Sequence, residues 1–214
     1  MLPHAAVLDS SPLAYSERVA LPDDSKTTVH VFRLPLRDTR IRVANLGSAR
    51  RVPDVCDELG GHVVAAMSGG FFAREARQPL GELWVNGELQ SHVPFQAPWH
   101  DIRGALHVGA DHISIDWRSM LPAQPEGDLL QAGPILVMDG RPAVNVATDI
   151  EGFHAGSRQF DSDITVGRYP RAAIGYDDTY VYGIVVDGRP LMRAYSIASA
   201  HYEEHLEFFS IKVP

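Results

Sequence analysis

A chain of 214 residues is long enough to bury a full hydrophobic core, and 45% hydrophobic with 21% charged residues is typical of a globular protein. The formal net charge of −8 repels a phosphate backbone, so we expect no nucleic-acid partner. The single cysteine, Cys56, excludes an internal disulfide.

The start of the chain has neither the basic region nor the long apolar run of a signal peptide, which leaves the localisation open. Every apolar stretch is too short to cross a bilayer, so we expect no membrane span. Turn-forming prolines at positions 3, 12 and 22 predict an irregular lead-in over residues 1–27.

The first regular elements are two expected strands, at residues 28–34 and 41–46, the second with alternating apolar and polar side chains. An amphipathic helix is predicted over residues 52–59. Its apolar positions share one face, Pro53 suits its first turn, and a glycine pair follows it. Cys56 lies on the apolar face of this helix.

A continuous apolar run at residues 62–67 predicts a strand buried on both faces. The run ends in Ser68-Gly69-Gly70-Phe71-Phe72, where two residues without Cβ let the backbone approach a ligand with its amides. The two rings that follow can stack on a flat ligand face. The alternative is a tight turn followed by two core phenylalanines.

The rest of the chain reads as a series of hairpins. Turns are expected at Asn86-Gly87, at residues 109–112, at Asp139-Gly140 and at Asp177-Asp178. Residues 148–167 are polar and mixed, which predicts a long surface loop of the kind that often carries function. We therefore expect a single α+β domain over residues 28–214, mostly antiparallel or mixed sheet with a few peripheral helices.

Four ordered blocks resemble the phosphodiester glycosidase family. They are the helix and strand that lead into Gly69-Gly70-Phe71-Phe72, the stretch from Ala132 to Gly140, the stretch from Arg171 to Gly175, and the stretch from Val185 to Arg189. The resemblance implies hydrolysis of the bond between a sugar's anomeric carbon and a phosphodiester oxygen, on a small-molecule or polysaccharide-derived sugar phosphate. It also implies that relatives are often exported, some of them linked to exopolysaccharide metabolism.

This chemistry needs a cation for the phosphate and a carboxylate for the sugar centre. Arg171 is the candidate phosphate clamp, because a guanidinium meets phosphate oxygens as a bidentate fork. Asp187 is the first candidate for nucleophile or base, since we expect the end of an apolar strand to desolvate it partly. A simple turn at Asp187-Gly188 is the alternative, and Glu82 and Asp139 are weaker candidates.

Further substrate contacts are expected at strand ends. Ser68, Gly69, Gly70, Phe71, Phe72 and Gly133 are the candidates, together with Arg189, which either pairs with Asp187, reaches the phosphate or is a solvated surface residue.

The sequence departs from the family pattern in two places. Ser68 stands where the family usually has asparagine, and the Asp-Gly-Gly-type segment that follows the family's last strand is absent here. The departures favour an alternative function, a non-catalytic glycan or glycosyl-phosphate binding module. Its sugar-stacking surfaces would be Phe71, Phe72, Trp84 and Trp99.

Histidines at positions 201 and 205 match the H-x-x-E-H zinc pattern, but a zinc site needs a third protein ligand and few residues remain after them. Asp161 and Asp163 could hold a hard cation, although a solvated loop explains them equally well. We therefore expect neither a metal nor a cofactor, and the sequence leaves the oligomeric state open.

Overall fold

The computed structural model describes residues 13–47, 52–59, 63–73, 76–144, 149–153 and 169–188, and the backbone of 208–212. Its helices are α1 (Val52–Leu59) and α2 (Trp99–Ile102), with short 3₁₀ turns at Leu36–Asp38 and Arg118–Met120. Its strands are β1 (Leu13–Ala20), β2 (Lys26–Pro35), β3 (Arg40–Ala44), β4 (Val63–Ser68), β5 (Phe71–Ala73), β6 (Gln78–Leu80), β7 (Leu83–Val85), β8 (Glu88–Leu89), β9 (Gly104–Val108), β10 (Ile113–Trp117), β11 (Asp128–Gln131), β12 (Val137–Met138), β13 (Arg141–Pro142), β14 (Arg171–Tyr176), β15 (Tyr180–Val186) and β16 (Phe208–Lys212).

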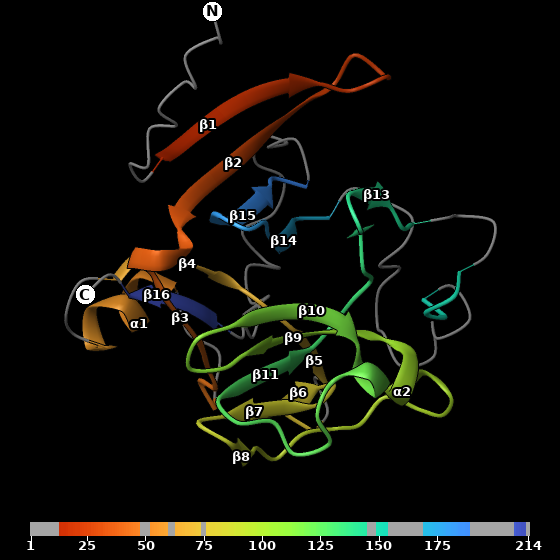
Figure 1. The fold of residues 1–214 in the computed structure, drawn as a ribbon. Coiled ribbons are helices and arrows are strands. Elements are labelled where there is room, and N and C mark those ends of the chain that lie inside the picture. The colour runs from red at the N-terminus through yellow and green to blue at the C-terminus, as the bar shows by residue number, and fades with distance from the viewer. Residues whose placement is uncertain are drawn as a thin grey trace, which may run out of the picture.

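Three sheets stacked in layers make up most of the described fold (Figure 1). A four-stranded sheet, ordered β1-β2-β15-β14, forms one layer, and a five-stranded sheet, ordered β10-β9-β11-β7-β8, forms the layer on the opposite side. The three-stranded sheet β3-β16-β4 lies between them, and β5-β6 and β12-β13 are separate two-stranded pairs. The fold is therefore sheet-rich with antiparallel strand pairing, and helices form only a small part of the expected α+β class.

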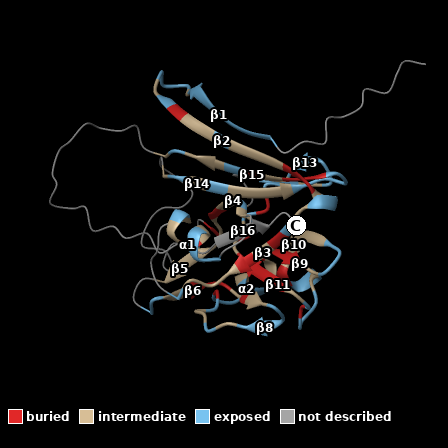
Figure 2. Ribbon diagram, turned by 90° about the vertical axis from the view of Figure 1, so that its left-hand side faces the viewer, coloured by how far each residue is buried: buried red, intermediate tan, exposed pale blue. Residues whose placement is uncertain are grey.

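The hydrophobic core lies where these three sheets meet (Figure 2). Each sheet contributes side chains at alternate positions of its strands, as a half-buried strand requires. They are Leu34 and Val181 from the first sheet, Leu83, Leu106, Val108 and Leu130 from the second, and Ile41, Val43 and Met67 from the third. One shared core ties the described residues into a single packed unit.

Asp128 fixes the junction between β11 and β3. Its buried carboxylate accepts hydrogen bonds from the backbone N–H of Val43 at 2.8 Å and of Asn86 at 2.7 Å. Arg42 Nε donates to the same carboxylate at 2.8 Å, and its guanidinium also contacts the Asn86 side chain. A buried charge needs this degree of pairing to be tolerated. The contacts join the middle sheet to the hairpin of β7 and β8.

Several expectations from the sequence are confirmed. The helix over residues 52–59 is α1, with Val55 buried. The turns at Asn86-Gly87 and Asp139-Gly140 close hairpins in which both central residues have positive φ. The pairs β9-β10 and β14-β15 are the other two expected hairpins.

Two expectations are wrong. Residues 13–27 are not an irregular lead-in, because β1 pairs with β2 along its whole length, and cross-strand pairing outweighs the nearby turn residues. The strand at 63–68 is not buried on both faces either, since Val64 is 47% exposed. It is an edge strand of the antiparallel sheet β3-β16-β4, so part of it stays open to solvent.

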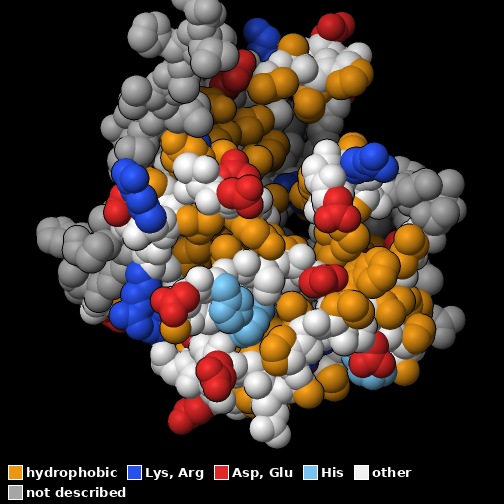
Figure 3. Space-filling model, in the orientation of Figure 1, with side chains coloured by type: hydrophobic (Ala, Val, Ile, Leu, Met, Phe, Trp, Pro, Cys, Tyr) orange, Lys and Arg blue, Asp and Glu red, His pale blue; other side chains and the backbone are white. Residues whose placement is uncertain are grey.

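The face drawn in Figure 3 carries acidic and basic side chains interspersed with hydrophobic ones, and its described basic side chains stand singly or in small groups. Within the described ranges, no helix is both long enough and apolar enough to cross a membrane.

Candidate functional site

A pocket of about 600 Å³ opens beside the hairpin of β12 and β13. Its walls come from the end of β10, from the stretch that follows Gly133, and from the turn at residues 150–151. The lining residues are Trp117, Ile135, Met138, Asp139, Arg141, Pro142, Ala143, Ile150 and Glu151. A largely apolar pocket with a few convergent polar groups is the usual form of a small-molecule site.

Glu151 is the buried carboxyl group among these lining residues, with 7% of the residue exposed. Its Oε2 accepts a hydrogen bond from the Gly104 N–H at 2.7 Å, and its Oε1 accepts one from the Ile135 N–H at 2.6 Å. Burial raises the pKa of Glu151, and the two amide donors and Arg103 offset that rise only in part. Each carboxylate oxygen has the capacity to accept one hydrogen bond more than these two amides supply.

Arg103 holds the other side of the turn that carries Glu151. It is fully buried, and it donates from Nε to the Glu151 carbonyl at 3.0 Å and from Nη2 to the Gly152 carbonyl at 3.3 Å. Its guanidinium lies 4.2 Å from the ring centre of Phe95 and 4.5 Å from that of Phe153. Burial lowers the pKa of Arg103 to about 10, so the group is still a cation at neutral pH.

Three glycines make room for this arrangement. A Cβ at residue 104 would lie 2.6 Å from Ile135, and one at residue 133 would overlap Glu151 Oε2. A Cβ at residue 152 would overlap the indole of Trp99. The candidate substrate contact Gly133 therefore lies against Glu151 and leaves space for its carboxylate.

Arg171 and Asp187 lie elsewhere, on neighbouring strands at one end of β14 and β15, because Arg171 pairs with Val186, the residue before Asp187. The alternation of a strand places their side chains on opposite faces of the sheet. The guanidinium of Arg171 lies 5.8 Å from the ring centre of Tyr169. Asp187 Oδ1 lies 3.3 Å from His30 Nε2, and its side chain is 54% exposed, so the expected desolvation is wrong. Neither residue lines the pocket described above.

The Asp187-Gly188 step is not a hairpin turn of type I′. That turn needs positive φ at both central residues, and neither residue is among the positive-φ positions of the described chain. The Asp187 N–H instead donates to the Thr28 carbonyl at 2.9 Å, which continues the pairing of β15 with β2.

The segment from Ser68 to Phe72 connects two sheets. Ser68 ends β4, Gly69 and Gly70 form the link, and Phe72 pairs with Pro79 in the β5-β6 pair. The ring of Phe71 packs 6.2 Å from that of Phe95 and 5.8 Å from that of Phe153, between ring centres. Phe71 therefore contacts the same aromatic cluster as Arg103.

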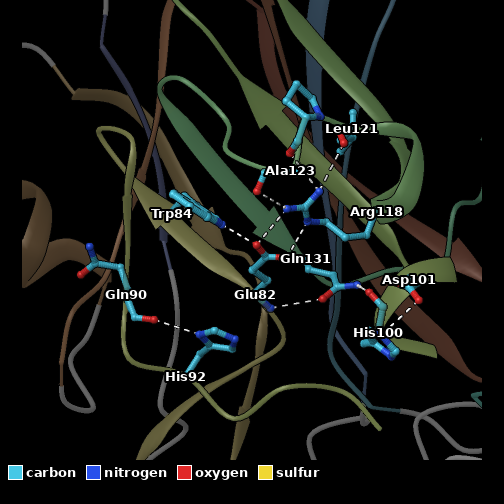
Figure 4. A network of polar contacts seen from close by, with 11 residues as sticks. Glu82, Trp84, Gln90, His92, His100, Asp101, Arg118, Leu121, Ala123 and Gln131 are labelled. Atoms are coloured by element: carbon cyan, nitrogen blue, oxygen red, sulfur yellow. Dashed lines mark hydrogen bonds and ion pairs between the residues drawn. The ribbon is translucent and has the colours of Figure 1, made fainter. Parts of the chain in front are cut away.

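Glu82, a weaker candidate for the carboxylate role, belongs to a structural network (Figure 4). Arg118 donates to both of its oxygens, at 2.5 and 2.9 Å, and Trp84 Nε1 donates at 2.6 Å. Gln131 accepts from the Glu82 N–H and donates to the His100 carbonyl. Burial raises the pKa of Glu82, but the donors from Arg118 and Trp84 outweigh it and the net pKa is lowered.

Sequence reasoning missed Glu151, Arg103, Arg141 and Trp117. The segment 148–167 was expected to be a surface loop, yet Glu151, Gly152 and Phe153 are buried. The pair Gly152-Phe153 within a polar stretch was the signal that could have indicated burial.

Arg189, the two histidines at 201 and 205, Asp161 and Asp163 lie outside the described residues. Within the described part, no group of three His, Cys, Asp or Glu side chains could hold a metal ion.

A short stretch of this chain closely matches the sequences of ferredoxin–NADP reductases. A stretch of 32 residues is 88% identical to ferredoxin–NADP reductase of Pseudomonas aeruginosa, covering 15% of this chain and 12% of the reductase. A stretch of 31 residues is 87% identical to the reductase of Azotobacter vinelandii, covering 14% of this chain and 12% of that one. The chain thus spans about an eighth of these relatives, and so short a stretch cannot bury a domain core of its own.

A much longer match concerns the fold. The catalytic domain of zebrafish N-acetylglucosamine-1-phosphodiester alpha-N-acetylglucosaminidase, solved in a form auto-inhibited by its pro-peptide, superposes with a TM-score of 0.51 at 15% identity. The match covers 84% of this chain and 61% of that one. The sequence profile of the phosphodiester glycosidase family matches residues 61–209, which is most of the chain. The chain belongs to the phosphodiester glycosidase family.

Proposed function

We propose that this protein hydrolyses the bond between the anomeric carbon of a sugar and a phosphodiester oxygen, at the pocket of β12 and β13. Water attacks the anomeric carbon, the carbon–oxygen bond breaks, and the products are a free sugar and a phosphate monoester. The observation that carries the proposal is that this pocket combines the buried carboxyl group of Glu151 with residues from the Ala132–Gly140 block that resembles the family.

The polar groups of the pocket match the demands of the reaction. The leaving phosphate departs as an anion and needs a cation, which Arg141 supplies at the exposed hairpin. The attacking water needs a base, and burial makes the Glu151 carboxylate a stronger base than an exposed one. Asp139, on the same hairpin, is a second carboxylate for the oxocarbenium-like centre.

The β14-β15 end is a second candidate place for the same reaction. Arg171 would clamp the phosphate there, and Asp187 would act as nucleophile or base, with Arg189 as a further contact. What supports it is that Arg171 begins β14 opposite Val186, the residue before Asp187, so the two candidates lie on neighbouring strands, with their side chains on opposite faces of the sheet. Ser68, Gly69, Gly70 and Phe72 stay proposed substrate contacts in either case.

The test is to incubate the protein with a panel of sugar-1-phosphodiesters and to measure the release of free sugar. We expect Glu151→Gln to lower kcat/KM by about 10²-fold to 10⁴-fold, the usual contribution of an acid–base group. We expect Arg141→Ala to raise KM, because its cation binds the phosphate in the ground state as well as during reaction. Arg37→Ala is the matched control, since Arg37 is an exposed arginine outside the pocket that pairs with its neighbour Asp38.

Two outcomes redirect the proposal. If Arg171→Ala and Asp187→Asn abolish release while Glu151→Gln does not, the reaction takes place at the β14-β15 end. If the wild-type protein releases no sugar from any substrate but binds sugar phosphates in a calorimeter, it is the non-catalytic binding module.

A further inference from the structure

Residues 103 and 104 both donate hydrogen bonds to Glu151, one to its backbone and one to its side chain. The Arg103 side chain donates to the Glu151 carbonyl, and the Gly104 N–H donates to the Glu151 carboxylate. Two neighbouring residues at the start of β9 therefore fix both the backbone and the side chain of one glutamate.

We propose that Arg103 is the positioning residue of the pocket, holding the turn at residues 149–153 so that the Glu151 carboxyl group faces the substrate. The inference rests on the proposed function for its kinetic test. Arg103 itself does not line the pocket, so it acts through Glu151.

The guanidinium of Arg103 donates hydrogen bonds to backbone carbonyls and not to the Glu151 carboxylate, so the carboxylate remains a group of the pocket. Arg103 donates to two successive carbonyls, those of Glu151 and Gly152, from two nitrogens of one planar fork, whereas a lysine offers a single nitrogen with no fixed plane. If the guanidinium instead formed a direct ion pair with the carboxylate, it would compete with the substrate for the Glu151 oxygens. The amides of Gly104 and Ile135 hold those oxygens in place.

The surroundings of Arg103 restrict its movement. The rings of Phe95 and Phe153 lie within 4.5 Å of the guanidinium carbon, and the ring of Trp99 lies at 5.7 Å. Gly152 sits against that same Trp99 ring, with no room for a side chain. The turn thus has one packed position, which suits a group that must be held within a fraction of an ångström of its substrate.

Arg103→Lys tests the geometry, because it keeps the charge and loses the fork. We expect kcat to fall by about 10²-fold with KM within about twofold, since a small displacement of a reacting group has that effect. Arg118→Lys is the matched control. Arg118 is also a buried arginine with bonds to three carbonyls, but it holds Glu82 and lies outside the pocket.

Arg103→Met tests the charge. The Arg103 cation holds the Glu151 pKa down, so its removal should move the acidic limb of the kcat/KM profile to higher pH. Arg103→Lys should leave the acidic limb at the same pH.

Equal losses of kcat in Arg103→Lys and Arg118→Lys would overturn the proposal, and so would a higher KM at unchanged kcat in Arg103→Lys.

A second measurement needs no substrate. Arg103→Lys should speed hydrogen exchange at the Gly104 and Ile135 amides, and Arg118→Lys should not. Gly152→Ala, which displaces the turn against Trp99 without changing Arg103, should speed the same two amides. Should the wild type prove inactive, unchanged exchange in the Arg103 and Gly152 variants would overturn the positioning role, whereas faster exchange would support it and leave only the hydrolytic function refuted.

Discussion

Gly133 and Glu151 occupy adjoining space, because a Cβ on residue 133 would overlap Glu151 Oε2. Gly133 also has a φ of +81°, in the region that favours glycine. The carboxylate can therefore keep its bonds to two backbone amides only while residue 133 has no side chain.

Gly133→Ala should destabilise the protein more than Gly140→Ala. Gly140 has a φ of +69° with no atom within 4 Å of its Cβ position, so alanine there incurs only the backbone cost of about 1–2 kcal/mol. Alanine at 133 should add about 1–3 kcal/mol, because it displaces a buried carboxylate from its donors. Urea unfolding of both variants measures the difference. Equal losses would show that the carboxylate moves aside freely.

Glu151→Gln should change how stability depends on pH. The folded protein holds the Glu151 proton more tightly than the unfolded chain, because burial raises the pKa. As pH rises from the ordinary glutamate value through the folded value, the wild type should therefore lose stability at this site. Glutamine has no such titration, but its NH₂ group would face an amide donor, so a loss of about 1–3 kcal/mol should persist at every pH.

Unfolding free energies of the wild type and Glu151→Gln between pH 4 and 8 check this. The advantage of the wild type should be largest at the acid end and should shrink as the pH rises. Parallel stability curves would contradict the raised pKa.

Glu82→Gln should show the opposite pH dependence. Burial raises the pKa of Glu82, but the donors from Arg118 and Trp84 outweigh it and lower the pKa overall (Figure 4). The stabilisation is therefore fully present above the ordinary glutamate value and is lost as the pH falls through the folded value. Wild type and variant should differ most near pH 7 and converge in acid. A gap that widens toward acid pH would refute this.

Asp128→Asn should be among the most destabilising single changes in the core. It leaves Arg42 without its charge partner, and one of the two backbone donors would face the new NH₂ group because they bond to different oxygens. The cost should be about 3–5 kcal/mol, as for a broken buried pair. Asp38→Asn is the control, because Asp38 is exposed beside Arg37 and its loss should stay within about 1 kcal/mol. Thermal or denaturant unfolding compares the two, and similar losses would mean that the β11-β3 junction does not depend on this charge.

Local chemistry explains which parts of the fold could be predicted from the sequence. The helix α1 follows from the spacing of Val52, Val55 and Leu59, and the hairpins follow from Asn86-Gly87 and Asp139-Gly140, whose backbones tolerate positive φ. The strand β1 could not be predicted in this way, because its stability comes from pairing with β2.

In the candidate site, too, some features follow from local sequence and others only from the packing of separate elements. The sequence by itself determined the family blocks, among them the stretch from Ala132 to Gly140. The sheet pairs Arg171 with Val186, and the alternation of a strand then places the Asp187 side chain on the opposite face. Only the tertiary structure decided that Glu151 is buried against Gly133 and accepts hydrogen bonds from residues 103 and 104. These residues are 18 to 48 positions apart, and no local pattern encodes contacts that depend on how separate sheets pack.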